Sequence, residues 1–476
     1  MAKAPVADGS PLGWHARRTV TLAWPIIVSR AGLIVLFAVD TFMAGQAGGL
    51  ELAGLGLGVA PLLTVMLVSM GALQAAVVLA AQAIGRGEHS GVGDTLRAGL
   101  ANAALLGVLT GLLSIWAEPF FLLTRQDPAV SAIAADVAVQ FAWGLPGQLL
   151  FITANLMLEA TDRPRVGMVV MLFANVLNVA LDGVFVLGWG DLVETGGAAT
   201  AMATSSVVRW LTFLAALAVL LHGARRDGNR HGILAPMSRW IRAATTMGGA
   251  EGREIRRMGL PMGLGQGVES AAFSSLMFFA GIIGTAALAA HQTTMTVMSL
   301  VYMNAVGLGG AASIRVGNAV GRRFPVDLAR AGWSAIGLGG LFSGVCGLAM
   351  IAFPGEIASL VVDDPAAVAV STGTLRFAGY FVAFDAMMGV AMGALRGLGD
   401  VWVPLWLQSA AFWFVAVPLA WYLGIHMEIG AVGLFAGIGA GILASLALLL
   451  PRFRVVAGRA SGRWRVADPG RQDGAP

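Results

Sequence analysis

Twelve runs of mostly apolar residues, each about 20 residues long, decide what this chain can fold into, because an α-helix of that length crosses the hydrocarbon core of a membrane. We therefore predict an all-α integral membrane protein with twelve transmembrane helices. The composition agrees, because 57% of the residues are hydrophobic and only 12% are charged, whereas soluble domains carry roughly 25% charged residues. The predicted spans are residues 20–43, 54–83, 96–117, 131–159, 166–188, 197–221, 259–282, 287–312, 330–353, 367–394, 402–423 and 430–451.

The charged residues are divided unevenly between the connections. Arginines dominate the connections after the even-numbered spans, and acidic residues dominate the alternate ones. Since basic connections stay in the cytoplasm, we predict a cytoplasmic N-terminal tail at 1–19, a cytoplasmic basic tail at 452–476 and a long cytoplasmic connection at 222–258. This bias accounts for the net charge of +4. The expected surroundings are therefore the lipid bilayer, and nucleic acid is not an expected partner.

The two halves of the sequence repeat each other. The matching segments, at offsets of 236 or 237 residues, are 43–54 with 279–290, 83–86 with 319–322 and 127–129 with 364–366. Each half holds six spans, so the halves have the same orientation in the membrane. We predict two parallel six-helix repeats, an N-lobe at 20–221 and a C-lobe at 259–451, an architecture found in transporters. The connection at 222–258 is then the linker, and its basic sequence suits a short amphipathic helix at the membrane surface.

Carboxylates inside the predicted spans include Asp40, Asp182, Glu269 and Asp385. A charge at the bilayer centre costs about 2.5 kcal/mol or more, so such residues usually face a polar cavity or one another. At the repeat offset, each position is apolar in the other half. The counterparts are Leu276, Pro418, Leu33 and Leu149. The symmetry of the scaffold does not require these acids, which favours a role in coupling transport to a cation or a proton.

The N-lobe offers further polar residues near its acids. Asn178 precedes Asp182 by four residues, so the two lie on one face of a helix. An amide oxygen beside a carboxylate offers oxygen ligands for a small cation, or a relay for a proton. Thr204 and Asn155 would complete such a cluster. The structural alternative is that Asn and Thr form hydrogen bonds between helices, and that Asp40 is a helix-end residue reaching the interface.

The C-lobe combines its acids with residues suited to a ligand. Gln266 precedes Glu269 in one span, and Met388 follows Asp385 in another. We predict that Glu269 and Asp385 bind the coupling ion and the substrate, with Na+ as one candidate at this site. Gln266 and Met388 are candidate substrate contacts, because adaptable Met surfaces suit varied apolar ligands. Met is also a common core residue, and this alternative stays open.

Arg30, Arg209 and His291 are further titratable residues in predicted spans. Arg30 either pairs with an acid or extends to the interface, Arg209 is long enough to reach the cytoplasmic interface, and His291 fits a helix-packing role better than a titrating one. The sequence contains no Walker A loop, no His-rich metal spacing and no nucleophile elbow. We therefore expect a protein that is not an enzyme, needs no cofactor and uses an ion gradient.

Several segments together resemble the multidrug and toxic compound extrusion (MATE) transporters, and the NorM branch in particular. They are the first span from Pro25 through Asp40 to Gly45, Ala289-Ala290-His291-Gln292, the segment from Gly310 to Gly317, and Gly393-Ala394-Leu395-Arg396-Gly397 with Asp400. The resemblance covers the whole twelve-span core. It implies a V-shaped, two-lobe, monomeric antiporter of the inner membrane. Such proteins export organic cations in exchange for Na+ or H+ by alternating access.

The resemblance also implies roles for individual residues. Asp40 corresponds to the first-span acid linked to cation or proton coupling, and Glu269 and Asp385 correspond to the C-lobe cation and substrate site. The residues that correspond to the N-lobe polar cluster are Asn178, Asp182, Asn155 and Thr204.

Other functions remain open at this point. A flippase for lipid-linked precursors shares the architecture, but its cavity would need cations for a pyrophosphate, whereas the buried charges here are mainly acidic. An exporter of one specific metabolite is a second alternative. A scaffold or receptor that transports nothing would explain the repeat but not four separated intramembrane acids.

Overall fold

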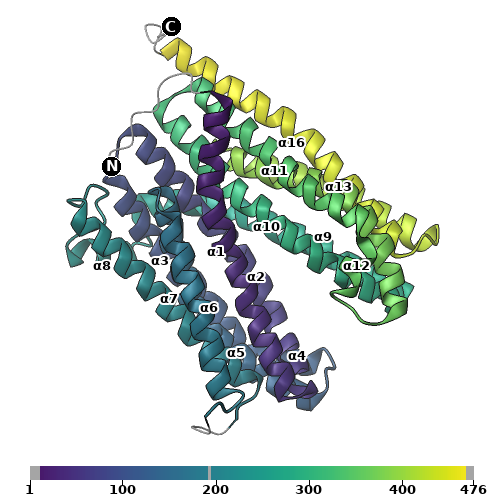
Figure 1. Cartoon of the computed structure of the whole chain (residues 1–476). Coiled ribbons are helices and arrows are strands. Elements are labelled where there is room, and N and C mark those ends of the chain that lie inside the picture. Colours follow the sequence, from purple (N-terminus) through teal and green to yellow (C-terminus); the bar gives the residue numbers. More distant parts are fainter. Residues whose placement is uncertain (1–10, 191–194, 468–476) are drawn as a thin grey trace. The chain divides into compact units, whose positions relative to one another are not determined.

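The computed structural model describes residues 11–190 and 195–467, and this part of the chain contains helices and no strands (Figure 1). Twelve helical segments among these residues are long and apolar enough to cross a membrane, which confirms the predicted number of spans. The helices up to the middle of the chain are α1 (Leu12–Ala47), α2 (Gly49–Arg86), α3 (Gly91–Leu113), the 3-10 turn Ser114–Trp116, α4 (Ala117–Leu123), α5 (Pro128–Ala160), α6 (Pro164–Phe185), α7 (Ala198–Arg226) and α8 (Met237–Thr245). They are followed by α9 (Gly249–Ile283), α10 (Thr285–Arg322), α11 (Pro325–Ala352), α12 (Pro354–Ser359), α13 (Pro365–Gly397), α14 (Trp402–Ala410), α15 (Val417–Trp421) and α16 (Ala431–Ala467).

The internal repeat is visible in the helix lengths and in the turns before the helices. α2 and α10 each contain 38 residues, and α5 and α13 each contain 33. α2 and α10 both follow a glycine with positive φ, 140° at Gly48 and 142° at Gly284, which side chains disfavour. α5 and α13 both start with Asp-Pro, and the carboxylates of Asp127 and Asp364 accept hydrogen bonds from amides of the first turn. The repeat thus preserves both the length and the start of each helix.

α5 and α13 are the central helices of their halves, and they are the most buried of the described spans. α5 packs against α2, α3 and α7, whereas α13 packs against α10, α11 and α16. Small residues permit this packing: a Cβ atom at Gly393 of α13 would lie 2.3 Å from the carbonyl oxygen of Gly309 on α10, so only glycine fits there.

The chain divides into two compact units. One unit, called the first half below, is Val28–Gly267; the other, called the second half, is Val268 onward together with the chain up to Ile27. The boundaries of these units differ from those of the lobes predicted at 20–221 and 259–451. The unit boundary after Ile27 lies within α1, and the boundary after Gly267 lies within α9.

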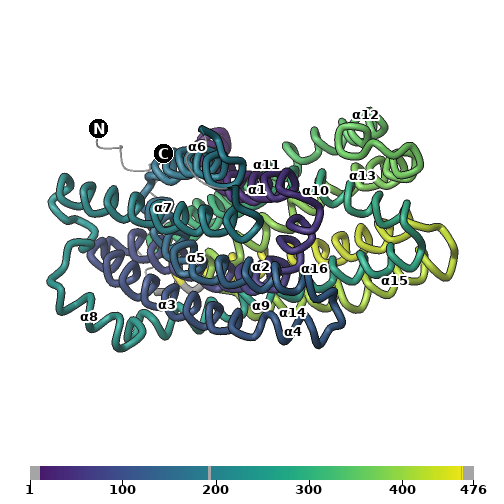
Figure 2. The backbone as a smooth tube through the Cα atoms, turned by 90° about the horizontal axis from the view of Figure 1, so that it is seen from below, coloured from purple at the N-terminus to yellow at the C-terminus, as the bar shows by residue number. Residues whose placement is uncertain are grey.

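The connection predicted as a linker at 222–258 is mostly helical and is attached to the first half. α7 continues to Arg226, α8 fills the middle of the connection and α9 already starts at Gly249. Arg97 of α3 donates a hydrogen bond of 3.0 Å to the carbonyl of Gly232, and its guanidinium lies 5.6 Å from the ring centre of Trp240 on α8. Figure 2 accordingly shows α8 beside α3, and α8 and α4 lie at opposite ends of the first half in both views.

The ends of the chain are more helical than the predicted tails. α1 starts at Leu12, within the predicted tail 1–19, and α16 continues to Ala467, within the predicted tail 452–476. The rest of both predicted tails, 1–10 and 468–476, lies outside the described residues.

The eleventh span is irregular. α14 is followed by a π-helical turn at Ala411–Ala416, then by α15 and a second π-helical turn at Tyr422–His426. Pro418 cannot donate the amide hydrogen bond that a continuous α-helix needs, which accounts for a wider turn before it. The first π-helical turn begins three residues after Gln408, which donates a hydrogen bond to Glu269.

Candidate functional site

The first half holds a fully buried polar cluster between α1, α6 and α7, called the first-half cluster. Asn178 of α6 joins its two acids, because its amide nitrogen lies 3.3 Å from Asp40 Oδ1 and 3.2 Å from Asp182 Oδ2. All three side chains are 0% exposed. The amide oxygen of Asn178 accepts no hydrogen bond from the described residues. The structure therefore brings together the first-span acid and the Asn178–Asp182 pair.

Two hydroxyl groups of α7 complete the first-half cluster. The hydroxyl of Ser205 lies 2.7 Å from each carboxylate oxygen of Asp40, and the hydroxyl of Thr204 donates to Asp182. Thr204 was a predicted member of this cluster and is found in it. Ser205 was missed, although it directly follows Thr204 and shares its polarity. Asp40 lies about two turns before the end of α1 and is fully buried in this cluster, which does not fit a helix-end residue reaching the interface.

Asn155 does not belong to the first-half cluster, contrary to the prediction. Its amide donates a hydrogen bond of 2.8 Å to Glu159, whose carboxylate lies 3.3 Å from the guanidinium of Arg30. Glu159 is 2% exposed, so this is a buried ion pair. Arg30 therefore pairs with an acid, and that acid is Glu159 and not Asp40.

Arg209 of α7 lies beside the first-half cluster. Only 2% of this residue is exposed, so it does not reach the cytoplasmic interface as its length had suggested. Its guanidinium carbon lies 4.6 Å from the ring centre of Phe141 and 5.3 Å from that of Phe37. Side chains of a helix point back toward its N-terminus, which brings the guanidinium of Arg209 toward Asp40 and close enough for the two charges to interact.

The second half holds a corresponding group of acids, called the second-half cluster. Glu269 of α9 accepts a hydrogen bond of 3.2 Å from Gln408 of α14. Asp385 of α13 is 4% exposed and close enough to Glu269 for their charges to interact. The structure therefore brings the two predicted acids of the C-lobe into one site.

Two further residues of the second-half cluster were not predicted as site residues. Tyr302 on α10 is close enough to Glu269 and Asp385 to interact with their charges, and Arg396 at the end of α13 interacts with Glu269 and Tyr302. Arg396 lies in a segment of the family resemblance, whereas no feature of the sequence pointed to Tyr302 or Gln408. Each cluster thus combines two carboxylates with a neighbouring arginine.

The remaining predicted residues differ in their surroundings. Met388 is 0% exposed and belongs to the helix-packing core, so a ligand does not reach its side chain in this structure. Gln266 is half-buried, one turn before Glu269 on α9. His291 is buried with its ring centre 5.6 Å from that of Phe435, which agrees with a packing role.

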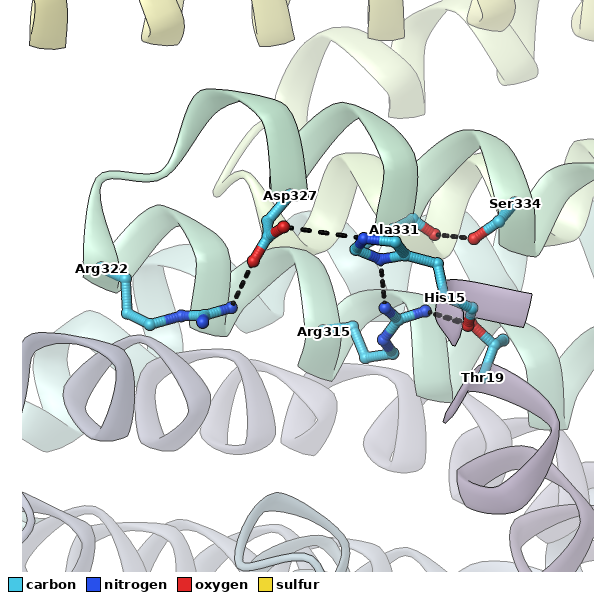
Figure 3. A network of polar contacts seen from close by, with 7 residues as sticks. All are labelled: His15, Thr19, Arg315, Arg322, Asp327, Ala331 and Ser334. Carbon is cyan, nitrogen blue, oxygen red and sulfur yellow. Dashed lines mark hydrogen bonds and ion pairs between the residues drawn. The ribbon is translucent and has the colours of Figure 1, made fainter. Parts of the chain in front are cut away.

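A third polar network attaches the start of α1 to the second half (Figure 3). Arg315 of α10 donates hydrogen bonds to His15, at 2.7 Å to its carbonyl and 2.6 Å to its Nδ1, and also contacts Thr19. The other ring nitrogen of His15 lies 3.6 Å from Asp327, which in turn pairs with Arg322 at 3.3 Å. This network explains why the first turns of α1 belong to the second half and not to the first.

Taken chemically, the two acid clusters have what a site for a small cation or a proton needs. Carboxylate, amide and hydroxyl oxygens bind hard cations, and buried carboxylates bind protons when no other cation is near. A twelve-span helical membrane protein with such a cluster in each of two repeated halves is, by class, a transporter.

The comparisons with known proteins agree with this class. The MatE family model matches residues 25–184 and 261–422. The chain therefore belongs to the MATE family of transporters, which confirms the predicted resemblance.

Among its relatives is the probable multidrug resistance protein NorM of Rhodopseudomonas palustris, with 31% identity over 95% of each chain. The multidrug resistance protein NorM of Burkholderia vietnamiensis is also 31% identical, over 92% of this chain and 93% of the relative.

Solved MATE structures share the fold. A eukaryotic MATE transporter superposes with a TM-score of 0.83 and 20% identity, covering 95% of this chain and 99% of the other. A MATE transporter from Vibrio cholerae superposes with a TM-score of 0.79 and 17% identity, covering 97% and 98% of the two chains.

Proposed function

We propose that this protein is a secondary active multidrug antiporter that exports cationic, lipophilic compounds in exchange for inward Na+ or H+ by alternating access. The observation that carries the proposal is the pair of acids within each half, Asp40 with Asp182 and Glu269 with Asp385; Glu269 is half-buried and the other three are buried. The full-length NorM relatives, named multidrug resistance proteins, support multidrug export. The arginine-rich connections support an inner-membrane orientation with both termini in the cytoplasm.

In the proposed cycle, the coupling ion and the substrate compete for the same negative charge. With the site open to the outside, Na+ or H+ neutralises the acids and the substrate leaves. With the site open to the inside, the ion dissociates, and Glu269 and Asp385 attract the next organic cation. Thermodynamic linkage requires that the ion and the substrate weaken each other's binding.

A flippase for lipid-linked precursors is the competing function. Its pyrophosphate cargo would need accessible cations, whereas Arg209 is 2% exposed and Arg30 is paired with Glu159. Binding of a fluorescent organic cation separates the two functions. We expect drugs to displace the bound dye, and we expect lipid pyrophosphates to leave it bound; the reverse pattern would support the flippase.

The antiport itself is tested by measuring binding of the dye at increasing Na+ concentration and, separately, at decreasing pH. The proposal requires that at least one of the two ions weakens dye binding, and that Asp385→Asn abolishes this dependence. Dye binding that is insensitive to both ions would overturn the proposal.

A further inference from the structure

Arg209 is a buried cation whose surroundings do not explain it as a packing residue. Its guanidinium lies against the neighbouring rings of Phe37 and Phe141, and its Nη1 lies 3.7 Å from the sulfur of Met202. Its Nη2 is buried and has no hydrogen-bond partner among the described residues. A methionine or leucine would fill such an apolar space without the cost of placing a charge in a membrane.

The anion that offsets this cost is Asp40. Ser205 lies one turn before Arg209 on α7, and its hydroxyl lies 2.7 Å from both oxygens of Asp40. Since the Arg209 side chain points back toward the start of α7, its guanidinium and the Asp40 carboxylate lie at a similar position along this helix. The charged groups that face Asp40 are Arg209 from α7 and Asp182 from α6. α5 contributes the uncharged ring of Phe141. At the repeat offset, the second half has Ser445 in place of Arg209, so the scaffold does not require the arginine.

The charge of the first-half cluster follows from these three residues. Two ionised carboxylates carry a charge of −2, and a guanidinium stays protonated in proteins, which leaves a net charge of −1. We propose that Arg209 is the permanent counter-ion of the first-half cluster, so that this cluster becomes neutral on binding one monovalent cation and not two. This inference rests on the proposed antiport and specifies the charge that the first half carries through the cycle.

Counting hydrogen bonds supports the same conclusion. One oxygen of Asp40 accepts from Ser205 and the other from Asn178, and one oxygen of Asp182 accepts from Thr204 and the other from Asn178. Among the cluster's amide and carboxylate oxygens, only Oδ1 of Asn178 is left without a partner. Oδ1 of Asn178 is therefore the oxygen of this set that can bind an added cation without losing a hydrogen bond.

The test is a proton titration of the purified full-length protein, in which infrared spectroscopy reads the carboxyl band of 13C-labelled aspartates. Asp385→Asn and Asp327→Asn are present throughout, so that Asp40 and Asp182 are the buried aspartates that remain among the described residues. Glutamates carry no label and do not contribute to the band. Arg209→Met removes the charge and keeps an unbranched apolar side chain. We expect its midpoint of protonation to rise by at least about one pH unit, a tenfold tighter binding of the proton, because a neighbouring positive charge is lost.

Two controls make the result specific. Arg209→Lys keeps the charge, so its midpoint should stay within a few tenths of a pH unit of the parent. Arg30→Met removes a buried cation of the same half that pairs with Glu159, so the aspartate midpoint should not move. An unchanged midpoint in Arg209→Met, or an equal shift in Arg30→Met, would overturn the assignment.

A second measurement applies if Arg209→Met folds poorly. Removing one partner of a buried charge pair leaves an uncompensated charge, whereas removing both does not. The double variant Arg209→Met with Asp40→Asn should therefore melt at a higher temperature than Arg209→Met alone, and an equal or lower melting temperature would contradict the assignment. Neither measurement depends on transport, so a failure of the proposed antiport remains distinguishable.

Discussion

The hydroxyl of Ser205 lies 2.7 Å from both carboxylate oxygens of Asp40 and so ties α7 to α1 inside the first half. Hydrogen bonds to charged groups contribute about 1.5–3 kcal/mol. Ser205→Ala should therefore destabilise the protein by about this amount and change the ion concentration at which transport is half-maximal.

The adjacent serine is a matched control for this prediction. Ser206 is also buried on α7, but its hydroxyl donates to the carbonyl of Gln140 at 2.6 Å and not to an acid. Ser206→Ala should lower stability without changing the ion dependence of dye efflux. If both variants changed the ion dependence equally, Ser205 would have no specific link to coupling.

The pair Glu269 and Asp385 leads to a prediction about export. Asp385→Asn keeps the size of a side chain that is 4% exposed and removes its charge. We expect cells that express this variant to lose resistance to organic cations, at normal amounts of protein in the membrane. Asp363→Asn changes an exposed acid before α13 and should leave resistance intact. Normal resistance with Asp385→Asn would rule out its proposed role.

The ion pair of Arg30 and Glu159 should contribute to stability and not to coupling. Breaking a buried ion pair costs about 3–5 kcal/mol in general, and the 13% exposure of Arg30 puts the expected loss for Arg30→Met at the low end of this range. Adding Glu159→Gln should recover part of the loss, as thermal melting would show. If the double variant lost more stability than the losses of the two single variants added together, this interpretation would be contradicted.

We expect local stability to depend on pH where the connection at 222–258 contacts the loop before α3. Burial, followed by the charge of Arg230, lowers the pKa of His89, and burial, followed by His89, lowers the pKa of His231. A lowered histidine pKa favours folding at neutral pH, and this contribution is lost as the pH falls below the unfolded value of about 6.5.

Hydrogen exchange of the Gly93 amide measures this effect, because that amide donates to the His231 carbonyl at 2.8 Å. Its protection factor should fall between pH 7 and pH 5. His89→Gln with His231→Gln should remove most of this fall. An equally large fall in the double variant would assign it to other groups.

The sequence was sufficient for the number of spans and for the repeat, because apolar length and repetition are local or periodic signals. It also identified the four acids, because a charge in an apolar run stands out. The partners of those acids depend on side-chain packing between helices. Asn155 and Arg30 therefore turned out to contact Glu159, an acid at the end of its predicted span, and Tyr302 and Gln408 gave no signal because neutral polar residues are common in membrane helices.

Ion-coupled export is tested most directly by dye efflux from membrane vesicles on which a Na+ gradient and a pH gradient are imposed separately. We predict that at least one gradient alone drives ethidium transport, and that Asp385→Asn abolishes it. Transport by the Na+ gradient would identify the acids as a Na+ site, and transport by the pH gradient would identify them as proton carriers. If neither gradient moved the dye through a folded protein, the antiport account would be wrong.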